Sequence, residues 1–86
     1  MPKIEIYSTT VCPYCIRAKM LLDKKKVPYE EINLTHFPER RDEMLKRANG
    51  KKTVPQIFIN GKHIGGCDDM YELDQKGQLD PLLVDK

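Results

Sequence analysis

Residues 3–26 read KIEIYSTTVCPYCIRAKMLLDKKK, and their pattern of polar, apolar and proline residues indicates a strand followed by a helix. Polar and apolar residues alternate at its start, which predicts a strand with Ile4 and Ile6 on one face. After a short loop, Pro13 suits the first position of a helix, because that position needs no N–H donor. A helix is therefore predicted over 13–26, ending in three lysines that the helix dipole favours there. Its apolar side is formed by Ala18, Leu21 and Leu22.

Turn signals divide the rest of the chain into further elements. Asn60-Gly61 separates two apolar runs and is typical of a two-residue hairpin turn, because both of its positions need positive φ. Glu30 and Glu31 favour an edge position for the strand that contains them. The predicted elements are a strand over 29–34, a helix over 38–48, strands over 56–59 and 62–64, a helix that Asp68 or a neighbour caps and that runs to about 76, and an apolar tail of Leu79, Leu82 and Leu83 that packs back on the body.

This order, β-α-β-α-β-β-α, predicts an α/β fold. The first β-α-β is expected to be a right-handed parallel unit, and the last two strands an antiparallel hairpin. The chain has 86 residues and no repeats or linkers, so we expect one domain over 1–86.

Composition and charge exclude several classes of function. The 15 Lys and Arg against 13 Asp and Glu leave a net charge of 15 − 13 = +2, and no aromatic cluster accompanies them, so nucleic acid is not an expected partner. No run approaches the ~18 apolar residues of a membrane span, and the N-terminus shows no apolar signal-peptide stretch. We therefore expect a soluble, cytoplasmic monomer with no membrane partner.

Cys12 and Cys15 lie three residues apart in Cys12-Pro13-Tyr14-Cys15, a spacing that points to reversible redox chemistry. Cysteine attacks as a thiolate. Cys12 lies just before a helix, where free backbone N–H groups and the dipole favour the thiolate. Cys15 lies inside the helix and is expected to be more buried. Cys12 is thus predicted to attack a disulfide, and Cys15 to resolve the mixed disulfide that forms.

A Cys-x-x-Cys pair can also be half of a zinc site or a structural pair. Zinc needs four ligands, and the remaining candidates Cys67, His36 and His63 form no second closely spaced pair. A structural disulfide is disfavoured where thiols stay reduced. No metal is therefore expected.

Two more motifs suit a peptide-like ligand. Thr53-Val54-Pro55 precedes a predicted strand, and a cis bond at Pro55 would leave the N–H and C=O of Val54 free to pair with an extended ligand. Gly65-Gly66-Cys67-Asp68-Asp69 places a flexible turn at a helix N-terminus, where N–H groups bind a carboxylate and an Asp side chain binds an ammonium. The alternatives are an ordinary loop proline and a plain N-cap.

With these motifs, the chain resembles the glutaredoxin family, in particular its small dithiol type from bacteria. The resemblance covers essentially the whole chain and implies a thioredoxin-like fold, with a four-stranded mixed sheet of order 2-1-3-4 flanked by helices. It also implies a glutathione-dependent thiol–disulfide oxidoreductase, with glutathione as reductant and co-substrate. Glutathione mixed disulfides and protein disulfides, such as that of ribonucleotide reductase, are the implied substrates. The matching residues are Cys12-Pro13-Tyr14-Cys15, Arg17-Ala18-Lys19, Thr53-Val54-Pro55 and Gly65-Gly66-Cys67-Asp68-Asp69, in this order and spacing.

The same resemblance implies a role for each site residue. Cys12 is the nucleophile, and Cys15 resolves protein disulfides. The residues implied to hold glutathione are Tyr14 beside the thiol, Arg41 at the glycine carboxylate, Thr53, Val54 and Pro55 at the cysteinyl part, and Gly66, Cys67, Asp68 and Asp69 at the γ-glutamyl carboxylate and amine.

One position departs from the family pattern. Many members carry a lysine three residues before the nucleophile, whereas this chain has Thr9 there. Either Arg41, Lys51 or Lys52 compensates, or the affinity for glutathione is lower. Two other functions stay open: a redoxin that thioredoxin reductase reduces, which the departure allows, and an iron–sulfur cluster carrier, which the Pro and second Cys of the motif disfavour.

The remaining candidate residues have ordinary explanations. Cys67 is interpreted as a small, partly buried residue at a helix start in preference to a third redox thiol. His36 and His63 are expected to be solvated or locally hydrogen-bonded. Apart from Arg41, the basic residues in and after the second predicted helix are expected to form a solvated face; they are Arg40, Lys46, Arg47, Lys51 and Lys52.

Overall fold

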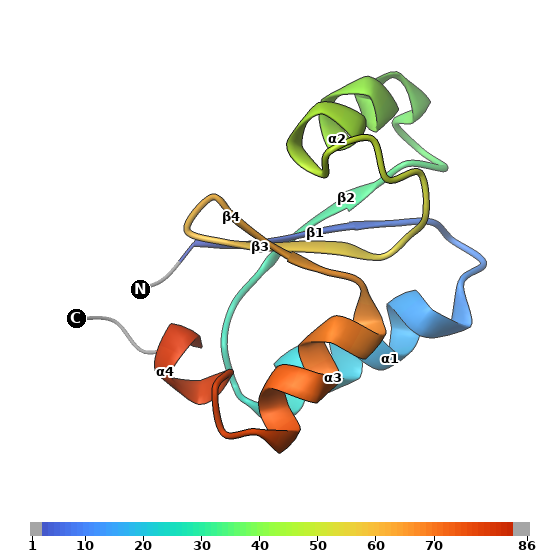
Figure 1. The fold of residues 1–86 in the computed structure, drawn as a ribbon. Helices are drawn as coiled ribbons and strands as arrows, with labels where there is room; N and C mark the ends of the chain where they lie inside the picture. The colour runs from blue at the N-terminus through green and yellow to red at the C-terminus, as the bar shows by residue number, and fades with distance from the viewer. Residues whose placement is uncertain (1–2, 84–86) are drawn as a thin grey trace.

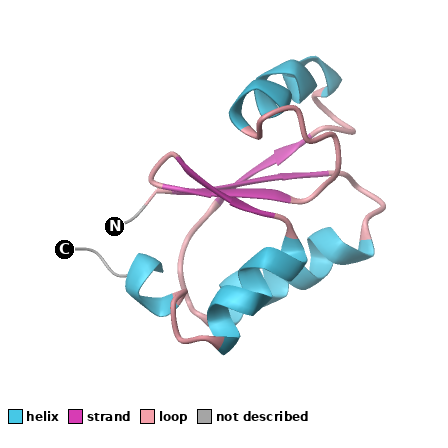
Figure 2. Cartoon of the chain, in the orientation of Figure 1, coloured by secondary structure: helices cyan, strands magenta, loops and turns pink. Residues whose placement is uncertain are grey.

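The computed structural model describes residues 3–83, and its elements follow the predicted order. They are β1 (Ile4–Ser8), α1 (Pro13–Lys24), β2 (Glu30–Asn33), the 3-10 turn η1 (Pro38–Arg40), α2 (Arg41–Arg47), β3 (Gln56–Ile59), β4 (Lys62–Gly65), α3 (Cys67–Gln75) and α4 (Asp80–Leu83). Figure 1 and Figure 2 show a sheet with helices on both of its faces. Within residues 3–83 no helix combines the length and the apolar character that crossing a bilayer requires.

The four strands form one mixed sheet in the order β2-β1-β3-β4, as predicted. β1 pairs in parallel with β2, whereas the β1–β3 and β3–β4 pairs are antiparallel. Asn60 and Gly61 form the β3–β4 turn with φ of 53° and 82°, which confirms the predicted hairpin. The edge position of β2 is confirmed as well.

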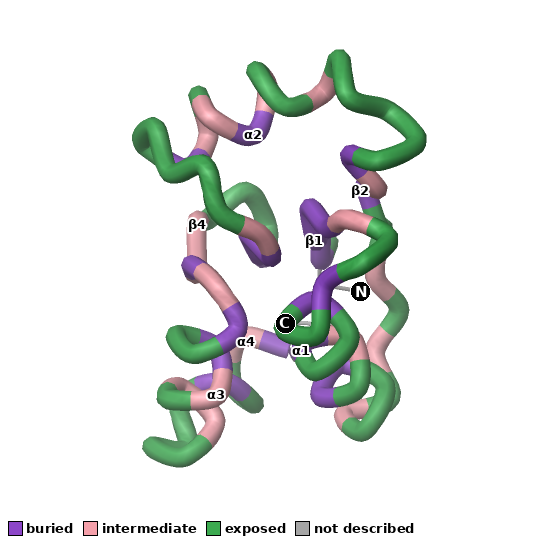
Figure 3. The backbone as a smooth tube through the Cα atoms, turned by 90° about the vertical axis from the view of Figure 1, so that its right-hand side faces the viewer, coloured by how far each residue is buried: buried purple, intermediate pink, exposed green. Residues whose placement is uncertain are grey.

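Side chains of the sheet alternate between two apolar clusters, one on each face. Ile4 and Ile6 of β1 pack in a cluster with residues of α1, α3 and α4. Tyr7 and Phe58 pack on the opposite face with Met44 of α2. Figure 1 shows α2 on one side of the sheet and the other helices on the opposite side. β1 runs between these layers, and the tube in Figure 3 is coloured as buried there, because all of its residues are buried.

The apolar tail packs on the first of these clusters, as predicted. Leu79 and Leu83 are buried in it, and part of the tail forms α4. Lys25, next to the end of α1, pairs with Asp74 at 2.6 Å and with Asp80 at 2.8 Å. This tie between α1 and the C-terminal elements was not predicted from the lysine run.

The prediction of a solvated basic face is wrong for Arg47. Its guanidinium donates to the two carboxylate oxygens of Glu5, at 3.1 and 2.8 Å, and to Tyr7 Oη at 2.9 Å. It also lies over the Phe58 ring, 4.1 Å from the centroid. Glu5 is 7% exposed, and its hydrogen bonds from Arg47 hold the pKa of its carboxyl below the usual range. α2 therefore covers the polar residue of β1 and supplies its partner.

Helix boundaries differ from the prediction at two helices. The helix predicted over 38–48 begins as the 3-10 turn η1 (Pro38–Arg40), and α2 itself spans Arg41–Arg47. α1 ends at Lys24, earlier than expected, and Lys26 has a φ of 60° in the turn that follows. Helices commonly end at a glycine or an asparagine in this left-handed conformation. A lysine in that position does not indicate a helix end, so the sequence does not predict where α1 ends. The predicted cap of α3, Asp68 or a neighbour, is Gly66, whose N–H donates a hydrogen bond to Asp69 Oδ2 at 2.9 Å.

Candidate active site

Cys12 is the N-cap residue of α1, which confirms its predicted position at the helix start. Its sulfur accepts a hydrogen bond from the backbone N–H of Cys15 at 3.1 Å, as an oxygen does in an ordinary N-cap. An N–H group aimed at sulfur stabilises negative charge on it, and the helix dipole acts in the same direction. With 8% of its surface exposed, Cys12 keeps limited contact with solvent.

Cys15 is fully buried, as expected from its place inside the helix. Burial, together with a hydrogen bond to Cys12, raises the pKa of the Cys15 thiol to about 12. A hydrogen bond from the Thr9 backbone and the charge of Lys19 act in the opposite direction but are weaker. The two cysteines thus differ in environment, and Cys15 holds its proton at neutral pH.

The loop before β3 lies beside Cys12. The Val54–Pro55 bond is cis. The Cys12 thiol faces the Val54 carbonyl oxygen, with the sulfur 3.9 Å from it. The redox pair and the Thr53-Val54-Pro55 motif, far apart in the sequence, are therefore neighbours in the fold.

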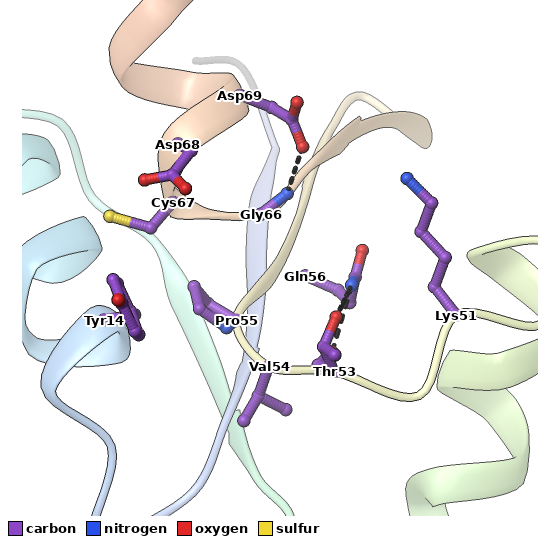
Figure 4. Close-up of a pocket in the computed structure, with 10 residues that line it drawn as sticks. All are labelled: Tyr14, Lys51, Thr53, Val54, Pro55, Gln56, Gly66, Cys67, Asp68 and Asp69. Atoms are coloured by element: carbon purple, nitrogen blue, oxygen red, sulfur yellow. Dashed lines mark hydrogen bonds between the residues drawn. The ribbon is translucent and has the colours of Figure 1, made fainter.

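A pocket of about 330 Å³ opens between the start of α1, this loop and the start of α3 (Figure 4). Its lining contains every residue implied to hold glutathione except Arg41, and it also contains Lys51 and Gln56. Cys12 borders the pocket through its contact with Val54. The lining residues are Tyr14, Lys51, Thr53, Val54, Pro55, Gln56, Gly66, Cys67, Asp68 and Asp69.

The positive charge at this pocket comes from Lys51. The Arg41 guanidinium donates to the Lys52 carbonyl at 3.3 Å, and Arg41 does not line the pocket. Figure 4 shows Lys51 at the far end of the pocket from Tyr14. Of the basic residues named as substitutes for the missing lysine at position 9, Lys51 is the one that lines the pocket.

The start of α3 supplies hydrogen-bond donors. The first N–H groups of a helix have no acceptor within it, and those of Cys67 and Asp68 are at this position. Asp68 and Asp69 are both exposed, and the Asp69 carboxylate accepts a hydrogen bond from the Gly66 N–H, a bond in which Asp68 takes no part. Gly65 has a φ of 120°, and a Cβ there would collide with the Asp69 side chain, so the turn requires glycine.

Cys67 is buried at the first position of α3, as the simpler interpretation expected. Burial and the neighbouring Asp68 raise the pKa of its thiol. Figure 4 shows its sulfur on the side of the pocket where Tyr14 lies. Among residues 3–83, no group of three or more His, Cys, Asp or Glu side chains is placed to hold a metal ion.

Gln56 is the site residue that the sequence analysis missed. It is 1% exposed at the start of β3, where its side chain bonds to Thr53 and to His63. The local hydrogen bonding expected for His63 is thereby confirmed. No local pattern distinguishes Gln56 from any other polar residue in a strand, so its role depends on the fold.

Known proteins are similar to this chain in sequence and in fold. The family model for glutaredoxin matches residues 4–64. Glutaredoxin 3 of Escherichia coli (strain K12) is 54% identical over 83 residues, which cover 96% of this chain and 99% of that protein. Glutaredoxin 1 of Rickettsia typhi is 56% identical over 81 residues, covering 93% of this chain and 78% of that protein. The crystal structure of a buckwheat glutaredoxin–glutathione complex is similar with a TM-score of 0.84 and 38% identity, covering 95% of this chain and 76% of that chain. This chain therefore belongs to the glutaredoxin family of thiol–disulfide oxidoreductases and has the thioredoxin-like fold of that family.

Proposed function

We propose that this chain is a glutathione-dependent thiol–disulfide oxidoreductase in which Cys12 is the nucleophile and Cys15 the resolving thiol. The observation that carries the proposal is the position of Cys12, whose sulfur caps α1 and faces the Val54 carbonyl at the edge of the pocket. A disulfide bound in the pocket presents its sulfur atoms to a group that is stabilised as an anion.

With a glutathione mixed disulfide, the reaction needs Cys12 alone. The Cys12 thiolate attacks the glutathionyl sulfur, the new S–S bond forms, and the other half of the substrate leaves as a thiolate that takes up a proton. A glutathione thiolate then attacks the glutathionyl sulfur held on Cys12. The products are glutathione disulfide and the free Cys12 thiolate.

With a protein disulfide, Cys15 completes the reaction. The Cys12 thiolate first forms a mixed disulfide with the substrate and releases one substrate thiolate. Cys15 then attacks the Cys12 sulfur, so that the Cys12–Cys15 disulfide forms and the second substrate thiolate leaves with the Cys15 proton. Once Cys12 is in a disulfide, it no longer carries the charge that helps raise the pKa of Cys15. Cys15 is therefore activated at the step that needs it.

The charges of the pocket suit glutathione, which carries an amine and two carboxylates. The N–H groups of Cys67 and Asp68 suit the γ-glutamyl carboxylate, and the Asp68 side chain suits the adjacent ammonium. Lys51 supplies the cation for the glycine carboxylate. The backbone of Val54 suits the cysteinyl part, which brings the glutathione sulfur to Cys12. The structure of a buckwheat relative in complex with glutathione supports glutathione as the ligand.

The test is turnover of a mixed disulfide between glutathione and a small thiol. One reaction contains glutathione, glutathione reductase and NADPH, and a parallel reaction contains thioredoxin reductase and NADPH. NADPH consumption that requires glutathione supports the proposal. Turnover with thioredoxin reductase alone would instead identify a redoxin that does not use glutathione.

Two serine variants test the division of roles. Cys12→Ser should abolish turnover of every disulfide. Cys15→Ser should keep the reaction with glutathione mixed disulfides and lose most reduction of protein disulfides. Equal loss of both reactions in Cys15→Ser would contradict the assigned roles.

A further inference from the structure

A chain of hydrogen bonds connects His63 on β4 to Thr53 at the pocket, and Gln56 is its middle member. Gln56 Nε2 donates to the Thr53 carbonyl oxygen at 3.0 Å and to Thr53 Oγ1 at 3.2 Å. Gln56 Oε1 lies 2.6 Å from His63 Nε2. Figure 4 shows Gln56 and Thr53 side by side, joined by dashed lines.

The chemistry of the groups fixes the direction of each bond. The Thr53 carbonyl can only accept, so the amide nitrogen of Gln56 must face Thr53. The amide oxygen of Gln56 then faces His63 and can only accept as well. His63 must therefore donate from Nε2, which fixes its neutral form as the Nε2–H tautomer.

The direction of the hydrogen bond from Gln56 determines whether the Thr53 hydroxyl can donate to a ligand. Its Oγ1 accepts the second hydrogen bond from Gln56, so the hydroxyl hydrogen is not used in that bond. Thr53 is exposed and lines the pocket. Its hydroxyl is thus free to donate toward an acceptor oxygen of a bound molecule.

We propose that His63 and Gln56 are positioning residues that hold Thr53 as a hydrogen-bond donor to a carbonyl or carboxylate oxygen of glutathione. The inference rests on the proposed glutathione-dependent function and adds two residues to it, neither of which bonds to the reacting sulfur atoms. In this relay, defined as His63, Gln56 and Thr53, each member fixes the polarity of the next.

His63 is held in place by its surroundings. Its ring stacks on Phe58 with centroids 4.9 Å apart and planes 29° apart. Burial and the charge of Lys51 lower the pKa of His63, with Asp69 acting weakly in the opposite direction. His63 is therefore neutral at neutral pH, and the tautomer of a neutral ring carries the direction of the relay.

The first test measures the tautomer in the free protein and needs no ligand. Long-range ¹H–¹⁵N NMR correlations distinguish a protonated ring nitrogen from a bare one in a neutral histidine. The relay requires His63 with a proton on Nε2 and a bare Nδ1 above its pKa. A proton on Nδ1 would overturn the proposal, whether or not the protein uses glutathione.

The second test measures binding against chemistry in the glutathione-coupled assay. His63→Leu removes the donor and should raise the KM for glutathione about three- to tenfold, the effect of one neutral hydrogen bond, with little change in kcat. His63→Gln carries an N–H donor at a comparable reach and should restore much of the loss. His36→Leu makes the same substitution at an exposed histidine outside the relay and should match the wild type.

A double-mutant cycle identifies the route of the effect. If His63 acts through the Thr53 hydroxyl, the KM changes of His63→Leu and Thr53→Val will not add in the double variant. Additive changes, or a KM in His63→Leu equal to that of the wild type, would overturn the relay. Absence of glutathione turnover in the wild type would instead overturn the proposed function, and the tautomer measurement would still test the relay.

Discussion

The rate at which Cys15 is alkylated in the reduced protein should show that the fold keeps this thiol protonated. Burial and the hydrogen bond to Cys12 raise the pKa of Cys15 from 9.0 to about 12. The difference, 12 − 9, leaves Cys15 with about 1000-fold less thiolate than an ordinary cysteine at neutral pH. A more basic thiolate is also a better nucleophile. With a Brønsted slope of about 0.45, the same pKa difference makes the Cys15 thiolate about 20-fold more reactive than an ordinary thiolate. Cys15 should therefore react with iodoacetamide at least about 50-fold more slowly than an ordinary thiol, because the loss of thiolate outweighs the gain in reactivity and burial also restricts the access of the reagent.

The assay is a time course of iodoacetamide labelling, quenched with acid and read by tandem mass spectrometry of the tryptic peptide 4–17. Fragment ions separate a label on Cys12 from one on Cys15, and protein unfolded in guanidinium gives the ordinary rate. Cys12→Ser is the matched control for the cause of the raised pKa. It removes the charge of Cys12 but keeps the burial and a hydroxyl that can hydrogen-bond in place of the thiol, so Cys15 should react faster than in the wild type and still slower than in the unfolded chain.

The pH dependence of the labelling rate tests the raised pKa of Cys15. Below a pKa of about 12, the labelling rate of Cys15 should rise about tenfold for each pH unit. A rate in the folded protein equal to that in guanidinium, or a plateau already near pH 9, would show that the environment of Cys15 does not hold its proton.

Three further predictions concern the sheet and the turn of the site. Arg47→Met leaves the buried Glu5 carboxylate without its partner and should cost about 2 kcal/mol of unfolding free energy in urea titrations, whereas adding Glu5→Gln should recover part of it. Because the folded pKa of Glu5 lies below its unfolded value, this contribution is present above about pH 5 and is lost as pH falls through the folded pKa. The stability difference between wild type and Arg47→Met should therefore shrink at acid pH to what the contacts of Arg47 with Tyr7 and Phe58 supply, and a difference of unchanged size there would contradict it. Gly65→Ala, which combines a φ of 120° with a collision against Asp69, should lower the melting temperature and raise the KM for glutathione, and unchanged values would show that the turn tolerates a side chain.

Features that depend on neighbouring residues were predictable. Asn60-Gly61 determined the hairpin, because positive φ at both positions is a local requirement. The position of Cys12 at a helix start followed from Pro13 beside it. The Glu5–Arg47 pair was not predictable, because it joins residues 42 apart in sequence across two layers of the fold. The alternation of β1 indicated a polar face but not that α2 covers it.

The site residues also separate into those that local sequence predicts and those that depend on the fold. Two of its motifs, the redox pair and the turn before α3, were found from spacing and local turn chemistry. Arg41 was assigned to the ligand by resemblance, but it does not line the pocket, since its guanidinium bonds to the Lys52 carbonyl. Gln56 lacked any sequence signal, because its function arises only where the fold brings Thr53 and His63 to its two ends.

The Cys15→Ser variant shows whether Cys12 is the nucleophile of a site that recognises glutathione. This variant is mixed with glutathione disulfide or with hydroxyethyl disulfide, which lacks the charged groups that the pocket matches. Intact mass and peptide mapping follow the adduct over time. We predict one glutathionyl group per chain, on Cys12, formed much faster than the hydroxyethyl adduct. A glutathionyl group on Cys67, or equal rates with the two disulfides, would contradict the account.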